Sequence, residues 1–162
     1  MGMKRLARIS TGGILAKNEA VLHSAKDKKQ EMNMEPVVIV ILLAVVEVIV
    51  LGLRAGMARG RAGVKAPAVT GDEVFERHFR VHYNTIEQMI LFVPGIWFFA
   101  EYVSVNWAAG LGLLFVVGRA IYAMSYVKDP ERRGAGMMLS VLPCWVLVLG
   151  ALGGATWSMI GG

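Results

Sequence analysis

The sequence has little cysteine and little charge. A single cysteine, Cys144, excludes a disulfide within one chain and a metal cluster built from several cysteines. Charged residues make up 18% of the 162 residues and hydrophobic residues 56%, whereas soluble domains have about 25% charged residues. With a mean hydropathy of +0.54, the chain is too apolar for an ordinary soluble domain, and its length fits one domain.

The positive net charge does not indicate a nucleic-acid partner. Of the 17 lysines and arginines, seven lie in residues 1–34 with three acidic residues, so the remainder of the chain is close to neutral. No basic face with interleaved aromatic residues accompanies this charge. We therefore expect no binding of nucleic acid.

Residues 1–34 differ from the rest of the chain. They have glycine pairs and scattered charge but no apolar core of a secretory signal. We interpret them as a basic extension, either disordered or the product of a start codon assigned too early, because "MEPVVIVILLAVVEV" from Met34 is a natural beginning. A transit peptide is a weaker alternative. Residues 35–162 are then expected to form one four-helix membrane domain.

Four apolar runs follow Met34, over about residues 36–53, 88–105, 107–126 and 136–160. Each approaches or exceeds the ~20 residues that span a bilayer core. Helices are expected because an open sheet edge cannot lie in lipid. The pattern predicts an all-α integral membrane protein, a bundle of four transmembrane helices over about residues 36–55, 72–103, 106–127 and 134–160.

Basic residues in the connecting segments predict the orientation of the bundle. Six lie between the first and second apolar runs, none lies between the second and third, and Lys128, Arg132 and Arg133 follow the third. Because positive charge marks cytoplasmic loops, loops one and three should be cytoplasmic, in a bacterial inner membrane or an equivalent internal membrane. Residues 1–34 oppose this orientation. Before the second helix, Thr70 is the expected N-cap, with Asp72 and Glu73 in the first turn.

Two polar stripes interrupt this apolar pattern. One has spacing i, i+4, i+7 and the other i, i+3, i+7, so each lies on one face of a helix. A guanidinium inside the third apolar run is expensive unless it is paired. The stripes are Arg80, Asn84 and Glu87 in the second helix and Arg119, Tyr122 and Tyr126 in the third.

The stripes have a structural and a functional interpretation. In the first, Arg119 pairs with Glu87 or Glu47 and the ion pair holds helices together. In the second, the stripes form a binding site for a small zwitterionic peptide, because arginine binds carboxylates, glutamate binds an ammonium, and amides and hydroxyls bind peptide groups. Glutathione, with two carboxylates, an amine and two amides, fits this inventory.

The same residues carry a family resemblance. "FERHFRVHYNTIEQ" (75–88) and "VVGRAIYAMSYVKDPERRG" (116–134) resemble the MAPEG superfamily, the membrane-associated proteins in eicosanoid and glutathione metabolism. The architecture agrees over about residues 36–160, and residues 1–34 have no counterpart. The resemblance implies a homotrimer of four-helix subunits with glutathione in the interface near the cytoplasmic side.

The resemblance also implies roles for individual residues. An arginine after helix three, Arg133 or alternatively Arg132, would stabilise the glutathione thiolate. Arg61 is an alternative to Arg59 as the basic residue after helix one. His82 and Gln88 depart from the leukotriene-forming branch, which has glutamine and tyrosine there. The implied glutathione contacts are Arg59, Arg80, Asn84, Glu87, Arg119, Tyr122 and Tyr126.

The resulting hypothesis is a membrane-bound glutathione transferase or peroxidase. Its co-substrate is glutathione, its other partners are membrane lipid and a hydrophobic electrophile or lipid hydroperoxide, and no metal takes part. His78 and His82 are four residues apart, but no third metal ligand is evident. Two alternatives stay open: a non-catalytic lipid-binding member of the same superfamily, and a small multidrug-type proton-coupled transporter that uses Glu47.

Overall fold

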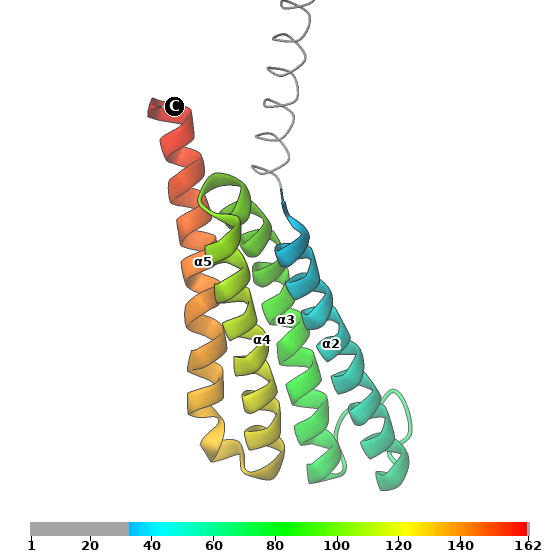
Figure 1. Ribbon diagram of the computed structural model, residues 1–162. Coiled ribbons are helices and arrows are strands. Elements are labelled where there is room, and N and C mark those ends of the chain that lie inside the picture. The colour runs from blue at the N-terminus through cyan, green and yellow to red at the C-terminus, as the bar shows by residue number, and fades with distance from the viewer. Residues whose placement is uncertain (1–32, 162) are drawn as a thin grey trace, which may run out of the picture. The chain divides into compact units, whose positions relative to one another are not determined.

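Four long helices make up nearly all of the computed structural model, which describes residues 33–161 (Figure 1). Consecutive helices run in opposite directions (Figure 1), and residues 33–161 contain no strand. Our interpretation of residues 1–34 lies almost entirely outside the described residues. The elements are α2 (Glu35–Ala62), α3 (Glu73–Tyr102), α4 (Val105–Lys128), the 3₁₀ helix η1 (Pro130–Arg133) and α5 (Gly134–Gly161).

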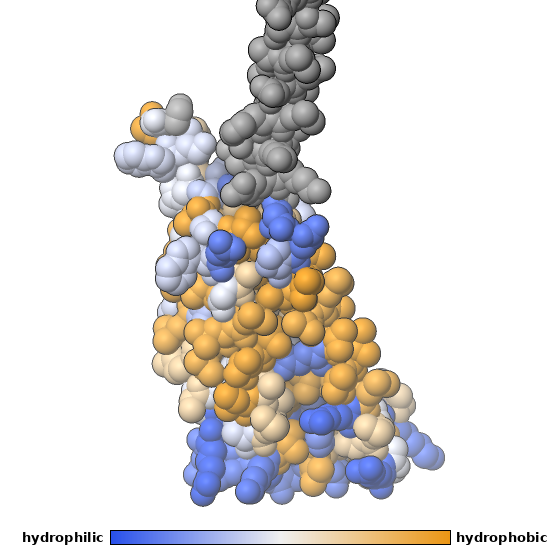
Figure 2. Space-filling view, viewed as in Figure 1, coloured by the Kyte–Doolittle hydropathy of each residue, from blue (hydrophilic) through white to orange (hydrophobic). Residues whose placement is uncertain are grey.

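Three of these helical segments, rather than the expected four, are long and apolar enough to cross a membrane: α2, α4 and residues 130–161. The exception is α3, because its first half, up to Glu87, is rich in charged residues and only its second half is apolar. Figure 2 shows an apolar band over the middle of the bundle, with hydrophilic residues gathered at the end where α2 and α4 finish. That end carries the charged half of α3.

Two helix ends differ from the expectation. α2 continues to Ala62, well beyond residue 55, because its stop signal is Gly63, which adopts a left-handed conformation with φ of 67°. Thr70 was the wrong cap for α3. The N-cap is Asp72, whose Oδ1 accepts a hydrogen bond of 2.8 Å from the Phe75 amide.

The core of the bundle is apolar and tightly packed. Phe92 of α3 stacks on Phe115 of α4 with ring centroids 4.0 Å apart, and both side chains are fully buried. α4 and α5 approach closely at Gly118, where an added Cβ would lie 2.6 Å from the Ser140 nitrogen. This close approach fixes the position of the next residue, Arg119.

Candidate functional site

Arg119 is the largest fully buried side chain among the described residues. Its Nη1 donates to Asn84 Oδ1 at 3.1 Å and its Nη2 donates to Thr85 Oγ1 at 2.6 Å. Its guanidinium also lies 4.2 Å from the centroid of the Tyr122 ring, a favourable cation–π distance. Arg119 therefore joins the stripe on α4 to the stripe on α3.

The ion pair of the structural interpretation, between Arg119 and Glu87 or Glu47, is not formed within the described residues. Within residues 33–161, Arg119 forms no ion pair, and its hydrogen-bond partners are neutral. Glu87 is connected to Arg119 only through Asn84, whose Nδ2 donates to the Glu87 carboxylate at 3.4 Å. Glu47 forms no hydrogen bond to Arg119, and both of its carboxylate oxygens are buried without a hydrogen bond among the described residues.

Two further buried atoms in the described part of the chain also lack hydrogen-bond partners. They are Gln88 Oε1 and Arg119 Nε. Gln88 follows Thr85 by three residues, so it lies one helical turn further along the same face of α3. Buried polar atoms are rarely unpaired, and a buried water with three partners is a common solution. The surroundings of Arg119 are thus polar but incompletely paired by protein atoms.

The two tyrosines extend this arrangement towards the 3₁₀ helix. The rings of Tyr122 and Tyr126 have centroids 5.5 Å apart, and the Arg133 guanidinium lies 5.8 Å from the Tyr126 centroid. Arg132 instead forms an ion pair of 3.1 Å with Asp129. The structure therefore brings Arg133, rather than Arg132, towards the tyrosines.

A cavity of about 360 Å³ lies beside these residues, near the Asp129–Pro130 turn. Arg80 of α3 and Tyr126 of α4 both line it, and Arg80 is exposed. The volume is at the lower end of the usual range for ligand pockets, about 300–1,000 Å³. The rest of its lining is Val69, Thr70, Glu73, Glu76, Arg77, Phe79 and Pro130.

Arg59 is not brought into contact with the two stripes. Its guanidinium lies 4.7 Å from the Phe75 ring centroid, and its Nη1 donates to the Ala68 carbonyl at 2.8 Å. These contacts hold the loop after α2 against the start of α3. Arg61 lines a different cavity, together with Arg54 and His78.

Sequence reasoning missed Thr85. Its hydroxyl donates to the Val81 carbonyl at 2.7 Å and accepts from Arg119, and it is 1% exposed. The available signal was its position beside Asn84 in a helix that faces an apolar run containing arginine. The described residues contain no group of three His, Cys, Asp or Glu side chains placed to hold a metal ion.

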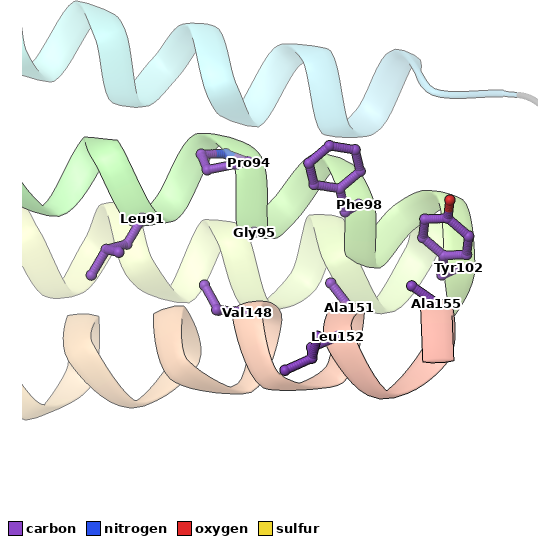
Figure 3. A pocket seen from close by; sticks show the side chains of 9 residues that line it. All are labelled: Leu91, Pro94, Gly95, Phe98, Tyr102, Val148, Ala151, Leu152 and Ala155. Atoms are coloured by element: carbon purple, nitrogen blue, oxygen red, sulfur yellow. The ribbon is translucent and has the colours of Figure 1, made fainter. Parts of the chain in front are cut away.

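A separate apolar cavity of about 430 Å³ lies between α3 and α5 (Figure 3). Its lining runs from Leu91 past Pro94 and Phe98 to Tyr102, and α5 contributes Leu152 among others. Among the described residues, the Tyr102 phenol is the one titratable group in the lining. This cavity suits hydrocarbon and is built from residues outside both polar stripes.

Comparison with known proteins gives a consistent result. Residues 37–153 match the model of the MAPEG family. An uncharacterized protein of Synechocystis is 44% identical over 117 residues, covering 72% of this chain and 85% of the relative. Microsomal glutathione S-transferase 2 of Homo sapiens is 35% identical over 120 residues, with coverage of 70% and 82%. Leukotriene C4 synthase of Bos taurus is 32% identical over 115 residues, with coverage of 70% and 77%.

Proposed function

The chain belongs to the MAPEG family of membrane proteins, and on that premise we propose that it is a membrane-bound glutathione transferase or peroxidase. Relatives named as a glutathione S-transferase and a leukotriene C4 synthase support this proposal. The observation that carries it is the Arg119 network, because one buried guanidinium links the α3 stripe to Tyr122 of α4.

We assign separate roles to these residues from their exposure and from the hydrogen bonds they already make. Both outer nitrogens of Arg119 are already occupied by Asn84 and Thr85, so we assign Arg119 to positioning Asn84 rather than to binding a carboxylate. Arg80 is exposed and lines the cavity, which suits it to a carboxylate of glutathione. Glu87 is exposed and suits the glutathione ammonium.

The chemical step that we propose needs a thiolate. A guanidinium beside a thiol lowers the pKa of the thiol and favours the thiolate, and Arg133 is the exposed cation that the structure brings towards Tyr126. In conjugation, the thiolate sulfur attacks the electrophilic carbon, a carbon–sulfur bond forms, and the leaving group departs with its electron pair. In peroxide reduction, two glutathione molecules are oxidised to the disulfide while the hydroperoxide is reduced to an alcohol and water.

The proposed enzyme works at the membrane surface as a homotrimer with loops one and three in the cytoplasm. The apolar band in Figure 2 supports entry of a hydrophobic co-substrate from the bilayer, while the polar end holding Arg80 and Arg133 faces water. We also propose that glutathione lies between subunits, because Arg80 and Glu87 are exposed in the single chain.

The test is glutathione-thiolate formation followed by turnover. Glutathione is added to purified protein in detergent, and the ultraviolet difference absorbance of the thiolate is recorded, with S-methylglutathione, which has no ionisable thiol, as the control. Turnover is then measured with a chlorodinitrobenzene and with a lipid hydroperoxide. A thiolate signal with turnover of either substrate is expected. Glutathione binding without thiolate or turnover would instead establish a non-catalytic binding protein.

A further inference from the structure

Two adjoining cavities lie between α2, α3 and α4 and share Arg54 and His78. The first has a volume of about 490 Å³ and is also lined by Arg61 and Asp72. The second, of about 210 Å³, is also lined by Lys128 at the end of α4. Basic side chains therefore gather here from two helices, around a space that a ligand of moderate size fits.

The two arginines in this place have no partner of opposite charge. Arg54 and Arg61 are exposed, and their guanidinium groups form no hydrogen bond or ion pair within residues 33–161. One carboxylate oxygen of Asp72 is occupied by the Phe75 amide. The pKa of His78 is lowered by burial and, in addition, by the charges of Arg54 and Arg61, which indicates a positive potential in the cavity.

The second cavity is apolar on its membrane side. Leu51 lies one helical turn deeper than Arg54 in α2, and Ala123, Met124 and Val127 of α4 complete the wall. Arg54 is the first basic residue after the apolar run of α2, so it lies where the hydrocarbon gives way to the headgroup region. A cationic cavity at the surface and an apolar cleft below it suit a ligand with an anionic head and a hydrocarbon tail.

We propose that these cavities bind an anionic phospholipid of the surrounding membrane, with its phosphate between Arg54 and Arg61 and an acyl chain in the cleft formed by Leu51 and Met124. Basic pockets between transmembrane helices on the cytoplasmic side are known to bind lipid phosphates. The inference does not rest on the proposed enzymatic function. Of its residues, only Arg61 was considered for glutathione, as the alternative to Arg59, and Arg61 lines this cavity rather than the one beside Arg80.

Glutathione does not suit this place. Its ammonium needs a free carboxylate. Among the described residues, Asp72 is the only acid that lines either cavity, and its carboxylate also caps α3. His78 and Arg80 are two residues apart on α3, which turns their side chains about 200° from one another. The lipid cavities and the cavity beside Arg80 therefore lie on different faces of α3.

The proposal is tested by native mass spectrometry of the full chain in detergent. Phosphatidylglycerol and, as the neutral reference, phosphatidylcholine are titrated, and bound lipid per chain is counted. We expect preferential binding of phosphatidylglycerol. Arg54→Gln and Arg61→Gln should each weaken it about fivefold, since one basic residue contributes about one such factor at a lipid surface. Lys65→Gln, which removes a charge from the loop after α2 and outside the lining of both cavities, should preserve it.

The remaining outcomes separate the competing explanations. Arg54 and Arg61 are exposed, so neither substitution changes the core, and circular dichroism checks the helix content of both variants. Equal binding of the two lipids would overturn the proposal, because it would show no preference for an anionic head. An equal loss in Lys65→Gln would also overturn it, because it would show that the charge of the whole surface, rather than the two cavities, attracts the lipid. Displacement of phosphatidylglycerol by glutathione would assign the cavities to glutathione instead. Inorganic phosphate at the same concentration should not compete with phosphatidylglycerol. Competition by phosphate would show that the acyl chain does not contribute to binding.

Discussion

Arg119 on α4 and Thr85 on α3 are joined by a hydrogen bond of 2.6 Å across 34 residues of sequence. Both side chains are buried, and the Thr85 hydroxyl uses its own proton to bond the Val81 carbonyl at 2.7 Å. The hydroxyl oxygen is thereby turned to accept from the guanidinium. This pair fixes α3 and α4 relative to one another at the depth where the polar stripes meet.

Replacing this hydroxyl should destabilise the bundle. Thr85→Val keeps the shape of the side chain but leaves one Arg119 N–H buried without a partner, at a cost of about 1–3 kcal/mol. The thermal unfolding midpoint in a fixed detergent should fall. The matched control is Thr156→Val, because the Thr156 hydroxyl bonds the Leu152 carbonyl at 2.7 Å on an exposed part of α5. Equal midpoints for the two variants would contradict the role assigned to the Thr85 hydroxyl.

The contact between α4 and α5 makes a second prediction. In Gly118→Ala, the new Cβ would lie 2.6 Å from the Ser140 nitrogen and 2.7 Å from the Leu139 carbonyl carbon, so the helices must separate beside Arg119. We expect a lower unfolding midpoint and weaker glutathione binding. Gly110→Ala on the same helix meets no atom within 4 Å and should be neutral or stabilising by up to about 1 kcal/mol, since alanine favours helices. Similar behaviour of both variants would disprove the close-contact explanation.

Much of the fold was predictable because apolar runs and i, i+3/i+4 spacing are local signals. The four helices and the shared faces of Arg80 with Asn84 and of Arg119 with Tyr122 follow from such patterns. The hydrogen bond from Arg119 to Asn84 confirms that the two stripes meet. By length and composition, α3 is less apolar than a membrane span, because its apolar half is only part of a helix that begins with charged turns.

The partner of Arg119 was not predictable from charge. The structural interpretation gave Arg119 an acidic partner because a buried cation is costly. In the structure, the guanidinium instead contacts an amide, a hydroxyl and an aromatic ring. Which neutral oxygens face a guanidinium depends on the rotation of two helices about their axes, and that rotation is set by packing at places such as Gly118. The assignment of individual glutathione contacts stays a prediction for the same reason.

The cavity beside His78 predicts a dependence of stability on pH. Burial, Arg54 and Arg61 lower the pKa of His78 from its ordinary 6.5, while Asp72 and, in the adjoining cavity, Lys128 are the other charged groups of the lining. The unfolded chain therefore binds a proton more readily, so this contribution is fully present above about pH 6.5 and is lost as pH falls towards the folded pKa.

The measurement is the unfolding midpoint of the wild type and His78→Gln at several pH values between about 7.5 and 5.5, the interval in which histidine titrates. The wild type should lose more stability on acidification than His78→Gln. His82→Gln, four residues along the same helix, retains His78 and should follow the wild type. Parallel curves for all three proteins would show that His78 does not titrate differently in the folded state.

The choice between Arg132 and Arg133 makes the sharpest catalytic prediction. The two arginines are adjacent and both exposed, but Arg132 pairs with Asp129 at 3.1 Å, whereas Arg133 lies 5.8 Å from the Tyr126 ring centroid. If Arg133 stabilises the thiolate, Arg133→Ala should lower kcat/KM about 100-fold, the usual loss when one electrostatic donor to a developing anion is removed. It should also abolish the thiolate absorbance while glutathione still binds.

Arg132→Ala is the matched control. It removes the same charge from the same turn, so it should retain both the absorbance and most of the activity. The reverse pattern would transfer the role to Arg132, and equal losses would show that the charge of the turn, rather than one placed guanidinium, promotes ionisation.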